Sequence, residues 1–121
     1  MYDLNTIKKQ NKPNSDHKPE LMESMTHTIT IGRNIGSDPM PNHKWQGFQS
    51  AIESFIDSHE SEIFVRSEGF GIWEGIKESN FTFVFATKKH LDIDHLKRLS
   101  KLFKQDAIAL TSGTTRLIGS N

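Results

Sequence analysis

The sequence predicts an α+β domain with the element order βαββαβ. Two segments carry apolar residues at helical spacing, and the segments around them have the alternation or the β-prone composition of strands. The helices are expected at residues 42–58 and from residue 92 or 94 onward, and the strands at residues 26–31, 62–67, 79–87 and 107–110. The chain thus divides into two βαβ halves. This order is typical of the ferredoxin-like fold, an antiparallel sheet with two helices on one face.

Residues 1–25 are expected to form a flexible N-terminal arm, and residues 26–121 the folded domain. The arm is rich in Asn, Lys, Pro, Ser, Asp and Glu, so it buries too little apolar surface to offset the entropy cost of ordering. A helical turn carrying Tyr2, Leu4 and Ile7 is the alternative. About 95 residues remain, close to the lower limit for a self-sufficient core. Self-association would help to stabilise such a domain.

The first strand, its loop and the first helix have distinct signatures. Thr28 and Thr30 alternate with Ile29 and Ile31, which indicates a half-buried strand. Two glycines, two prolines, Asn and Asp follow within residues 32–41 and predict an irregular loop. The apolar positions of the helix are Trp45, Phe48, Ile52, Phe55 and Ile56.

The two middle strands are expected to pair as an antiparallel hairpin, with Gly69 and Gly71 permitting the bend. In the second of them Phe81, Phe83 and Phe85 share one face, whereas Thr, Val and Ala share the other, so neither face is strongly polar. Only one face of this sheet meets the helices. The other face is expected to meet either a second subunit or water.

The second helix and the last strand complete the order. Asp92 or Asp94 can cap the helix, and Lys101 and Lys104 suit the negative end of its dipole. Its core-facing residues are expected to be Ile93, Leu96, Leu99, Leu102 and Phe103. The last strand is followed by a polar segment at residues 111–115.

The composition excludes several classes of function. The chain has 15 basic and 15 acidic residues, so it has no excess of positive charge for a nucleic-acid backbone. It has no Cys, which removes disulfides, thiolate nucleophiles and Cys-based zinc sites. No apolar run approaches the roughly 18 residues of a membrane span. A cytoplasmic protein without nucleic-acid or membrane partners is therefore expected.

Standard chemical motifs do not fit the spacing of the residues. His27 begins one His-x-Thr unit, but a two-histidine phosphoesterase needs a second unit, so we expect His27 to be a strand-edge residue. His90 and His95 are five residues apart and would lie on different faces of a helix, so no metal site is predicted. The six histidines are expected to be scattered on the surface. The glycines match neither GxGxxG nor a P-loop.

Unusual residues gather in the loops instead. Arg33 and Asn34 follow the first strand, and the hairpin carries Trp73 and Glu78. An indole at a glycine-rich bend offers a flat apolar surface for an aromatic ligand or a cation, and a partly desolvated carboxylate would act strongly on a bound cation. The alternative is an ordinary hairpin in which the indole packs on the core and Glu78 is solvated.

Residues 65–118 resemble the phage-encoded S-adenosylmethionine lyases. The likeness comprises a hairpin with a Gly-x-aromatic unit, the glutamate Glu78 before an alternating strand, and a helix that ends in Gln105-Asp106-Ala107-Ile108-Ala109-Leu110 before Ser112-Gly113-Thr114-Thr115. A related pattern also occurs in small ferredoxin-like proteins of unknown function.

This resemblance implies a homotrimer that cleaves S-adenosylmethionine to methylthioadenosine and homoserine lactone without a metal or another cofactor. Phages use the activity to deplete the methyl donor of the host, which would place the protein in the host cytoplasm as an anti-restriction factor. By position, Glu78 matches the family's essential glutamate, and Trp73 stands where the family has a catalytic-site tyrosine. An indole cannot supply a phenol hydroxyl. Trp73 can still stack on adenine or face the sulfonium.

Further substrate contacts are expected from residues outside this pair. The backbone at Arg66, Ser67 and Glu68 can hydrogen-bond adenine, and Arg33 or Arg116 can hold the substrate carboxylate. Asn34 belongs to the same predicted substrate-binding set. Two other interpretations stay open: a non-catalytic ferredoxin-like oligomer that binds a nucleotide-like ligand or a host protein, and a purely structural protein.

Overall fold

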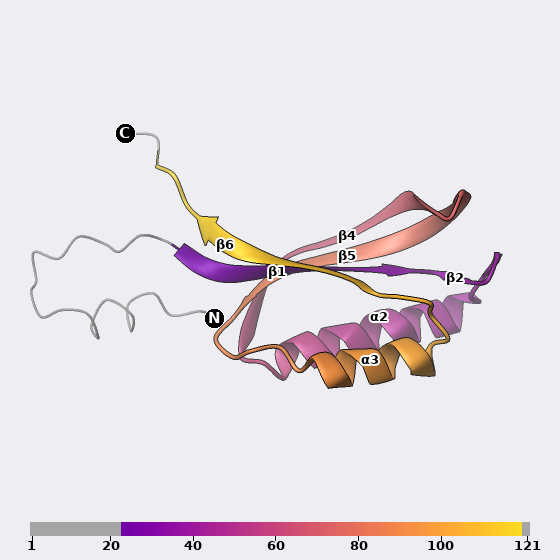
Figure 1. Ribbon diagram of the computed structural model, residues 1–121, viewed down its shortest axis with the longest axis horizontal. Helices are drawn as coiled ribbons and strands as arrows, with labels where there is room; N and C mark the ends of the chain where they lie inside the picture. The colour runs from indigo at the N-terminus through magenta and orange to yellow at the C-terminus, as the bar shows by residue number, and fades with distance from the viewer. Residues whose placement is uncertain (1–22, 120–121) are drawn as a thin grey trace, which may run out of the picture.

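The computed structural model describes residues 23–119 of the chain. Most of the predicted arm, residues 1–22, and the terminal residues 120–121 lie outside the described part. The elements are β1 (Glu23–Gly32), β2 (Asn34–Ile35), β3 (Asp38–Pro39), α2 (Asn42–Asp57), β4 (Ser61–Trp73), β5 (Ile76–Thr87), α3 (Ile93–Leu102) and β6 (Ala109–Arg116). Figure 1 shows how they are arranged.

The main sheet is antiparallel and has the strand order β4-β5-β1-β6. Helices α2 and α3 lie beside each other on one face of it, and no helix of residues 23–119 covers the other face, which we call the open face (Figure 1). Two interleaved βαβ halves produce this order. The predicted ferredoxin-like α+β fold is confirmed.

The core lies between the two central strands and the helices. On β1, Ile29 and Ile31 lie opposite Phe83 and Phe81 of β5, and of these four only Phe81 is partly exposed. The helical side chains buried against this layer are Trp45, Phe48, Ile52, Phe55, Ile56, Leu96 and Leu99. Burying each large side chain contributes about 1.5–3 kcal/mol, so this layer supplies most of the drive to fold.

The predicted bend at Gly69 and Gly71 is wrong. Strand β4 continues through both glycines to Trp73, and the hairpin turns at Glu74 and Gly75, which have φ values of 51° and 80°. Two successive residues with positive φ are the mark of a type I′ turn, whose twist matches that of the strands on either side. The glycines therefore lie within the strand, where they leave space on its open face.

Two other strand boundaries differ from the prediction. Strand β6 comprises residues 109–116 and so includes the polar segment that was expected to follow it, because that segment pairs with β1 from Glu23 to Thr30. Strand β1 begins at Glu23, three residues before the expected start of the domain. Pairing between β1 and β6 extends both strands beyond their apolar residues.

The expectation of scattered surface histidines is wrong for His27 and His59, which are buried. His27 lies in β1 between β5 and β6, so it is not a strand-edge residue. Its Nε2 is 3.2 Å from the hydroxyl of Thr87, which donates to Lys89 O, and its Nδ1 is 2.7 Å from the hydroxyl of Ser112. Nε2 therefore carries the proton, and Nδ1 accepts from Ser112.

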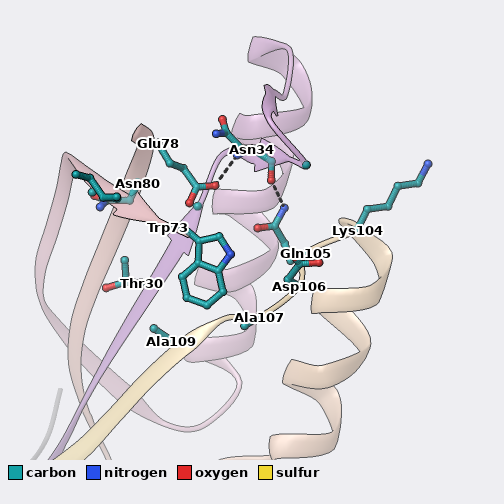
Figure 2. Close-up of a pocket in the computed structure, with 14 residues that line it drawn as sticks. Thr30, Asn34, Trp73, Glu78, Asn80, Lys104, Gln105, Asp106, Ala107 and Ala109 are labelled. Carbon is teal, nitrogen blue, oxygen red and sulfur yellow. Dashed lines mark hydrogen bonds between the residues drawn. The ribbon is translucent and has the colours of Figure 1, made fainter. Parts of the chain in front are cut away.

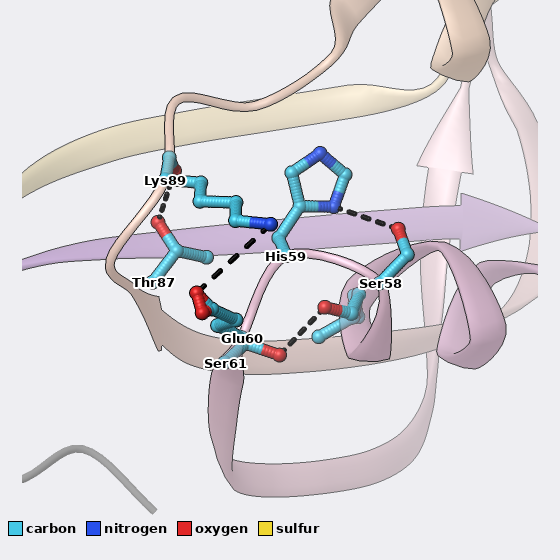
Figure 3. Close-up of polar contacts among 7 residues, drawn as sticks. Ser58, His59, Glu60, Ser61, Thr87 and Lys89 are labelled. Carbon is cyan, nitrogen blue, oxygen red and sulfur yellow. Dashed lines mark hydrogen bonds and ion pairs between the residues drawn. The ribbon is translucent and has the colours of Figure 1, made fainter.

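His59 connects the end of α2 to the beginning of α3. Its Nδ1 donates to Phe55 O at 2.7 Å, and its Nε2 accepts from the backbone N–H of Asp92 at 3.0 Å. Asp92 caps α3 by accepting from the backbone N–H of His95. Figure 3 shows His59 beside Ser58, with the neighbouring ion pair of Lys89 and Glu60 at 3.9 Å. The buried histidines thus have hydrogen-bonded structural positions.

Candidate functional site

A pocket of about 280 Å³ lies on the open face, at the end of the sheet where the hairpin turns. Its walls come from the end of β1, the following loop, the hairpin and the loop between α3 and β6. Figure 2 shows Trp73 between Glu78 and the backbone of the α3–β6 loop. The volume is near the lower end of the range for small-molecule sites, about 300–1,000 Å³.

Glu78 is held at this pocket by the backbone of β1 and its loop. The backbone N–H of Asn34 donates to Oε2 of Glu78 at 2.8 Å. The carboxylate lies over Gly32, and a Cβ at position 32 would overlap the carboxylate carbon and both oxygens. Glycine has no side chain, so it leaves the space beside position 32 empty. The side chain of Glu78 on β5 can therefore extend over the neighbouring strand β1.

Trp73 forms a wall of the pocket. It is the last residue of β4, and half of its surface is exposed. It is not part of the buried core between sheet and helices. An exposed indole that borders a carboxylate can face a cation or stack on an aromatic ring.

Asn34 links Glu78 to the α3–β6 loop. Its N–H binds Glu78, and its C=O accepts from Nε2 of Gln105 at 3.1 Å. The same Nε2 also donates to Phe103 O at 3.2 Å. Both hydrogen bonds are made by the backbone of Asn34. A shift of this residue would therefore move the carboxylate of Glu78 and the side-chain amide of Gln105 together.

The end of α3 positions the loop that carries Gln105. Lys104 has a φ of 56°, and the N–H groups of Lys104 and Gln105 bond the carbonyls of Lys101 and Ser100. This is the Schellman arrangement, in which the residue after the helix adopts the left-handed conformation. It turns the chain sharply from α3 toward the pocket.

The charges at the pocket favour a cationic ligand. Glu78 and Asp106 line it, whereas its one lining cation within residues 23–119 is Lys104, whose side chain extends away from Trp73 in Figure 2. The described residues contain no group of three or more His, Cys, Asp or Glu side chains that could hold a metal ion. The site therefore offers carboxylates, amides and an indole.

Some of the predicted site residues line the pocket and others do not. Trp73, Glu78 and Asn34 line it. Arg33 precedes Asn34 in the sequence, but its side chain points away from the pocket. The guanidinium of Arg33 donates to Met40 O at 2.7 Å and to Oδ1 of Asn42 at 2.8 Å. Arg33 thus joins the β1 loop to the first turn of α2.

Arg66, Ser67, Glu68 and Arg116 do not line this pocket. Arg66 forms two hydrogen bonds with Glu53 of α2, at 2.9 and 3.0 Å, and this interaction lowers the pKa of the Glu53 carboxyl. Arg116 lies opposite Glu23 at the far end of β1. Thr30, which lines the pocket, is seven positions along the strand from Glu23, so Arg116 and the pocket are roughly 24 Å apart at about 3.4 Å per residue.

Sequence reasoning missed Gly32 and Asn80 as pocket residues and did not assign a role to Gln105. Gly32 ends an alternating strand, which is a signal for close approach by another group. Asn80 lies on the face of its strand opposite the phenylalanines, together with Thr82, Val84 and Ala86. Neither signal shows that the residue belongs to a pocket, because that depends on how the strands pair.

No family model matches this chain, and no curated protein is significantly similar to it. A solved phage SAM lyase in its apo state is 12% identical with a TM-score of 0.49, over 82% of this chain and 94% of that one. A phage SAM lyase in complex with S-methyl-5′-thioadenosine is 14% identical with a TM-score of 0.46, over 78% and 90%. The chain therefore has a weak to moderate resemblance to phage SAM lyases, and the likeness is one of fold.

Proposed function

We propose that the protein cleaves S-adenosylmethionine to methylthioadenosine and homoserine lactone. The observation that carries this proposal is that the carboxylate of Glu78 and the indole of Trp73 line one pocket. A carboxylate and an aromatic face are the two groups that bind a sulfonium by charge and by cation–π attraction. The excess of carboxylates over ammonium groups at the pocket favours the same ligand.

The proposed reaction needs no proton transfer. A carboxylate oxygen of the methionine part attacks its own γ-carbon, the bond from that carbon to sulfur breaks, and the sulfur keeps the electron pair. The sulfonium becomes a neutral thioether, and the carboxylate becomes a lactone. The enzyme has only to hold the folded substrate and keep water out.

Each residue has a specific role in this scheme. Glu78 orients the sulfonium or the α-ammonium, and the N–H of Asn34 holds one of its oxygens so that the other can face the ligand. Trp73 walls the pocket against water. It provides no hydroxyl, so the scheme gives it no role in acid–base catalysis.

A homotrimer is part of the proposal. The edge strand β4 and the first residue of β5 expose large apolar side chains, which are Phe64, Val65, Phe70, Ile72, Trp73 and Ile76. Exposed apolar surface on an edge strand favours contact with another chain. In a trimer, Arg66, Ser67, Glu68 and Arg116 would contact substrate only from a neighbouring subunit, since they lie away from the pocket of their own chain.

The biological role follows from the chemistry. Consumption of the methyl donor would oppose host methyltransferases and the restriction systems that depend on it, which fits a phage protein acting in the host cytoplasm.

Incubation of the purified protein with S-adenosylmethionine, followed by chromatography, tests the proposal. We expect methylthioadenosine and homoserine lactone in equal amounts. Glu78→Gln should lower kcat/KM by about a hundredfold or more, because loss of the carboxylate lets the substrate leave its reactive geometry, and misplacing reacting groups has an effect of about this size. Glu74→Gln, in the exposed hairpin turn, is the matched control and should keep full activity.

Two results would contradict the proposal in different ways. Absence of both products with wild-type protein removes the lyase activity. Full activity of Glu78→Gln removes the assigned site but leaves the reaction.

A non-catalytic nucleotide-binding oligomer is the second candidate. It is favoured by the indole at position 73, which offers binding surface without an ionisable group. Binding of methylthioadenosine without any turnover of S-adenosylmethionine would select this alternative.

A further inference from the structure

Asn80 has an unpaired amide at the edge of the pocket. It lies on β5 two residues after Glu78, so the side chains of both residues lie on the open face. Among residues 23–119 no side chain or backbone group hydrogen-bonds this amide, whereas Glu78 and Gln105 are both bound to Asn34. Asn80 is only partly exposed, and it lines the pocket with Trp73. Its donor and its acceptor are therefore both available to a ligand.

Two glycines of β4 determine how the amide lies. Gly69 and Gly71 flank Asn80 across the strand pair, and added Cβ atoms there would lie 3.1 Å from Oδ1 and 3.0 Å from Nδ2. Contacts this short are tighter than nine in ten real Cβ contacts, so the amide would have to shift by a few tenths of an ångström. The amide therefore rests on the bare backbone of the edge strand. Gly32 is its partner on β1, so glycine flanks Asn80 on both neighbouring strands.

We infer that Asn80 recognises the exocyclic amine of an adenine ring and determines the base specificity of this pocket. An asparagine amide presents an acceptor beside a donor, and adenine presents its N6 amine beside a ring nitrogen, so the two groups can form a pair of hydrogen bonds. The indole of Trp73 supplies a surface on which the same ring can stack. This inference rests on the proposed function, whose substrate contains adenine.

A purine that lacks the amine should bind poorly for a physical reason. It would leave the amide oxygen of Asn80 desolvated without a partner, and such a loss is larger than the gain from one hydrogen bond. Sites that hydrogen-bond a polar group discriminate strongly against analogues that lack it. The stacking on Trp73 would be nearly unchanged. The difference in affinity between the two purines therefore measures the contribution of the Asn80 amide.

Isothermal titration calorimetry tests the inference with two probes. One is methylthioadenosine, and the other is the same nucleoside with hydrogen in place of the exocyclic amine. Wild-type protein should bind methylthioadenosine at least tenfold more tightly than the nucleoside that lacks the amine. Asn80→Ala should bring the two dissociation constants to within about twofold, chiefly by weakening methylthioadenosine. Ser79→Ala, the adjacent residue outside the pocket lining, should keep the wild-type ratio.

The outcomes separate this inference from the proposed function. Equal affinities in wild-type protein, or no binding of either nucleoside, overturn it without any variant, so it stays testable even if Asn80→Ala does not fold. A tenfold preference that persists in folded Asn80→Ala overturns it as well. If wild-type protein turns over S-adenosylmethionine but the preference persists in Asn80→Ala, the role of Asn80 is rejected and the lyase activity stands. If Asn80→Ala abolishes the preference but wild-type protein has no turnover, the lyase activity is rejected and the role of Asn80 stands.

Discussion

The carboxylate of Glu78 lies over Gly32, in the space that a side chain at position 32 would occupy. The last residue of β1 therefore determines where the carboxylate of β5 can lie. The hydrogen bond from the N–H of Asn34 holds it there.

Gly32→Ala should displace this carboxylate. The new methyl group overlaps the position of Glu78, so the side chain must leave the Asn34 N–H, and kcat/KM for S-adenosylmethionine should fall at least tenfold. Product chromatography measures this loss. Gly113→Ala, on the open face of β6, has no atom near its added Cβ and should keep wild-type function. Unchanged function in Gly32→Ala would show that the position of Glu78 is unimportant.

The stability of the fold should decrease in mild acid because of His27. Burial, with a smaller effect of His59 in the same direction, lowers the pKa of His27. The unfolded chain, with its ordinary value of about 6.5, then binds more protons than the folded chain. The contribution of His27 is therefore fully present above about pH 6.5 and is lost as the pH falls through the lowered value.

Thermal unfolding from pH 7.5 to pH 5 measures this effect. His27→Gln should have a lower Tm at pH 7.5 but a flatter dependence on pH, because the variant cannot take up the proton. His43→Gln replaces an exposed histidine of α2 and should keep the wild-type slope. A wild-type slope in His27→Gln would assign the acid sensitivity to other groups.

Lys104→Gly should stabilise the protein. Lys104 has a φ of 56° after α3, and glycine adopts this conformation without the roughly 1 kcal/mol that a side chain costs there. Tm should rise by a few degrees. Lys101→Gly, inside the last turn of α3, should instead lose about 1 kcal/mol. Similar shifts in both variants would mean that the backbone conformation does not matter.

The ion pair of Arg66 and Glu53 should contribute little to stability. The two side chains are 51% and 37% exposed, and pairs of this kind are worth about 0.2–1 kcal/mol. A double-mutant cycle with Arg66→Gln and Glu53→Gln, followed by chemical denaturation, measures the coupling. The coupling should shrink at 1 M salt, where charges are screened within about 3 Å. A coupling above 2 kcal/mol would contradict this estimate.

The helices and most of the core were predictable because their signals are local, but the expectation that Ile93 and Leu102 face the core is wrong, since both are exposed. The apolar spacing from Trp45 to Ile56 describes one face of α2, and the structure buries that face. The hairpin turn was missed because Glu74-Gly75 is a weaker turn signal than the glycines at 69 and 71. Glycine marks either a bend or a need for space, and the sequence does not distinguish the two.

The site was predictable only in part. Trp73 and Glu78 stand close together in the hairpin, so a shared pocket could be expected from the chain itself. Asn80 lies in the same hairpin, two residues after Glu78, whereas Asn34 and Gln105 reach that pocket from two other segments. Arg66 and Arg116 carry suitable charges, but pairing with Glu53 and the register of β6 place them elsewhere.

The order of elements and the apolar faces were determined by the sequence alone, because hydrophobic periodicity is a property of neighbouring residues. Only the tertiary structure decided which polar groups meet on the open face. Strand register brings Gly32 beside Asn80 and Gly71 beside Glu78, and a shift of one residue would move these side chains to the opposite face. The pocket thus depends on long-range pairing, which no local pattern encodes.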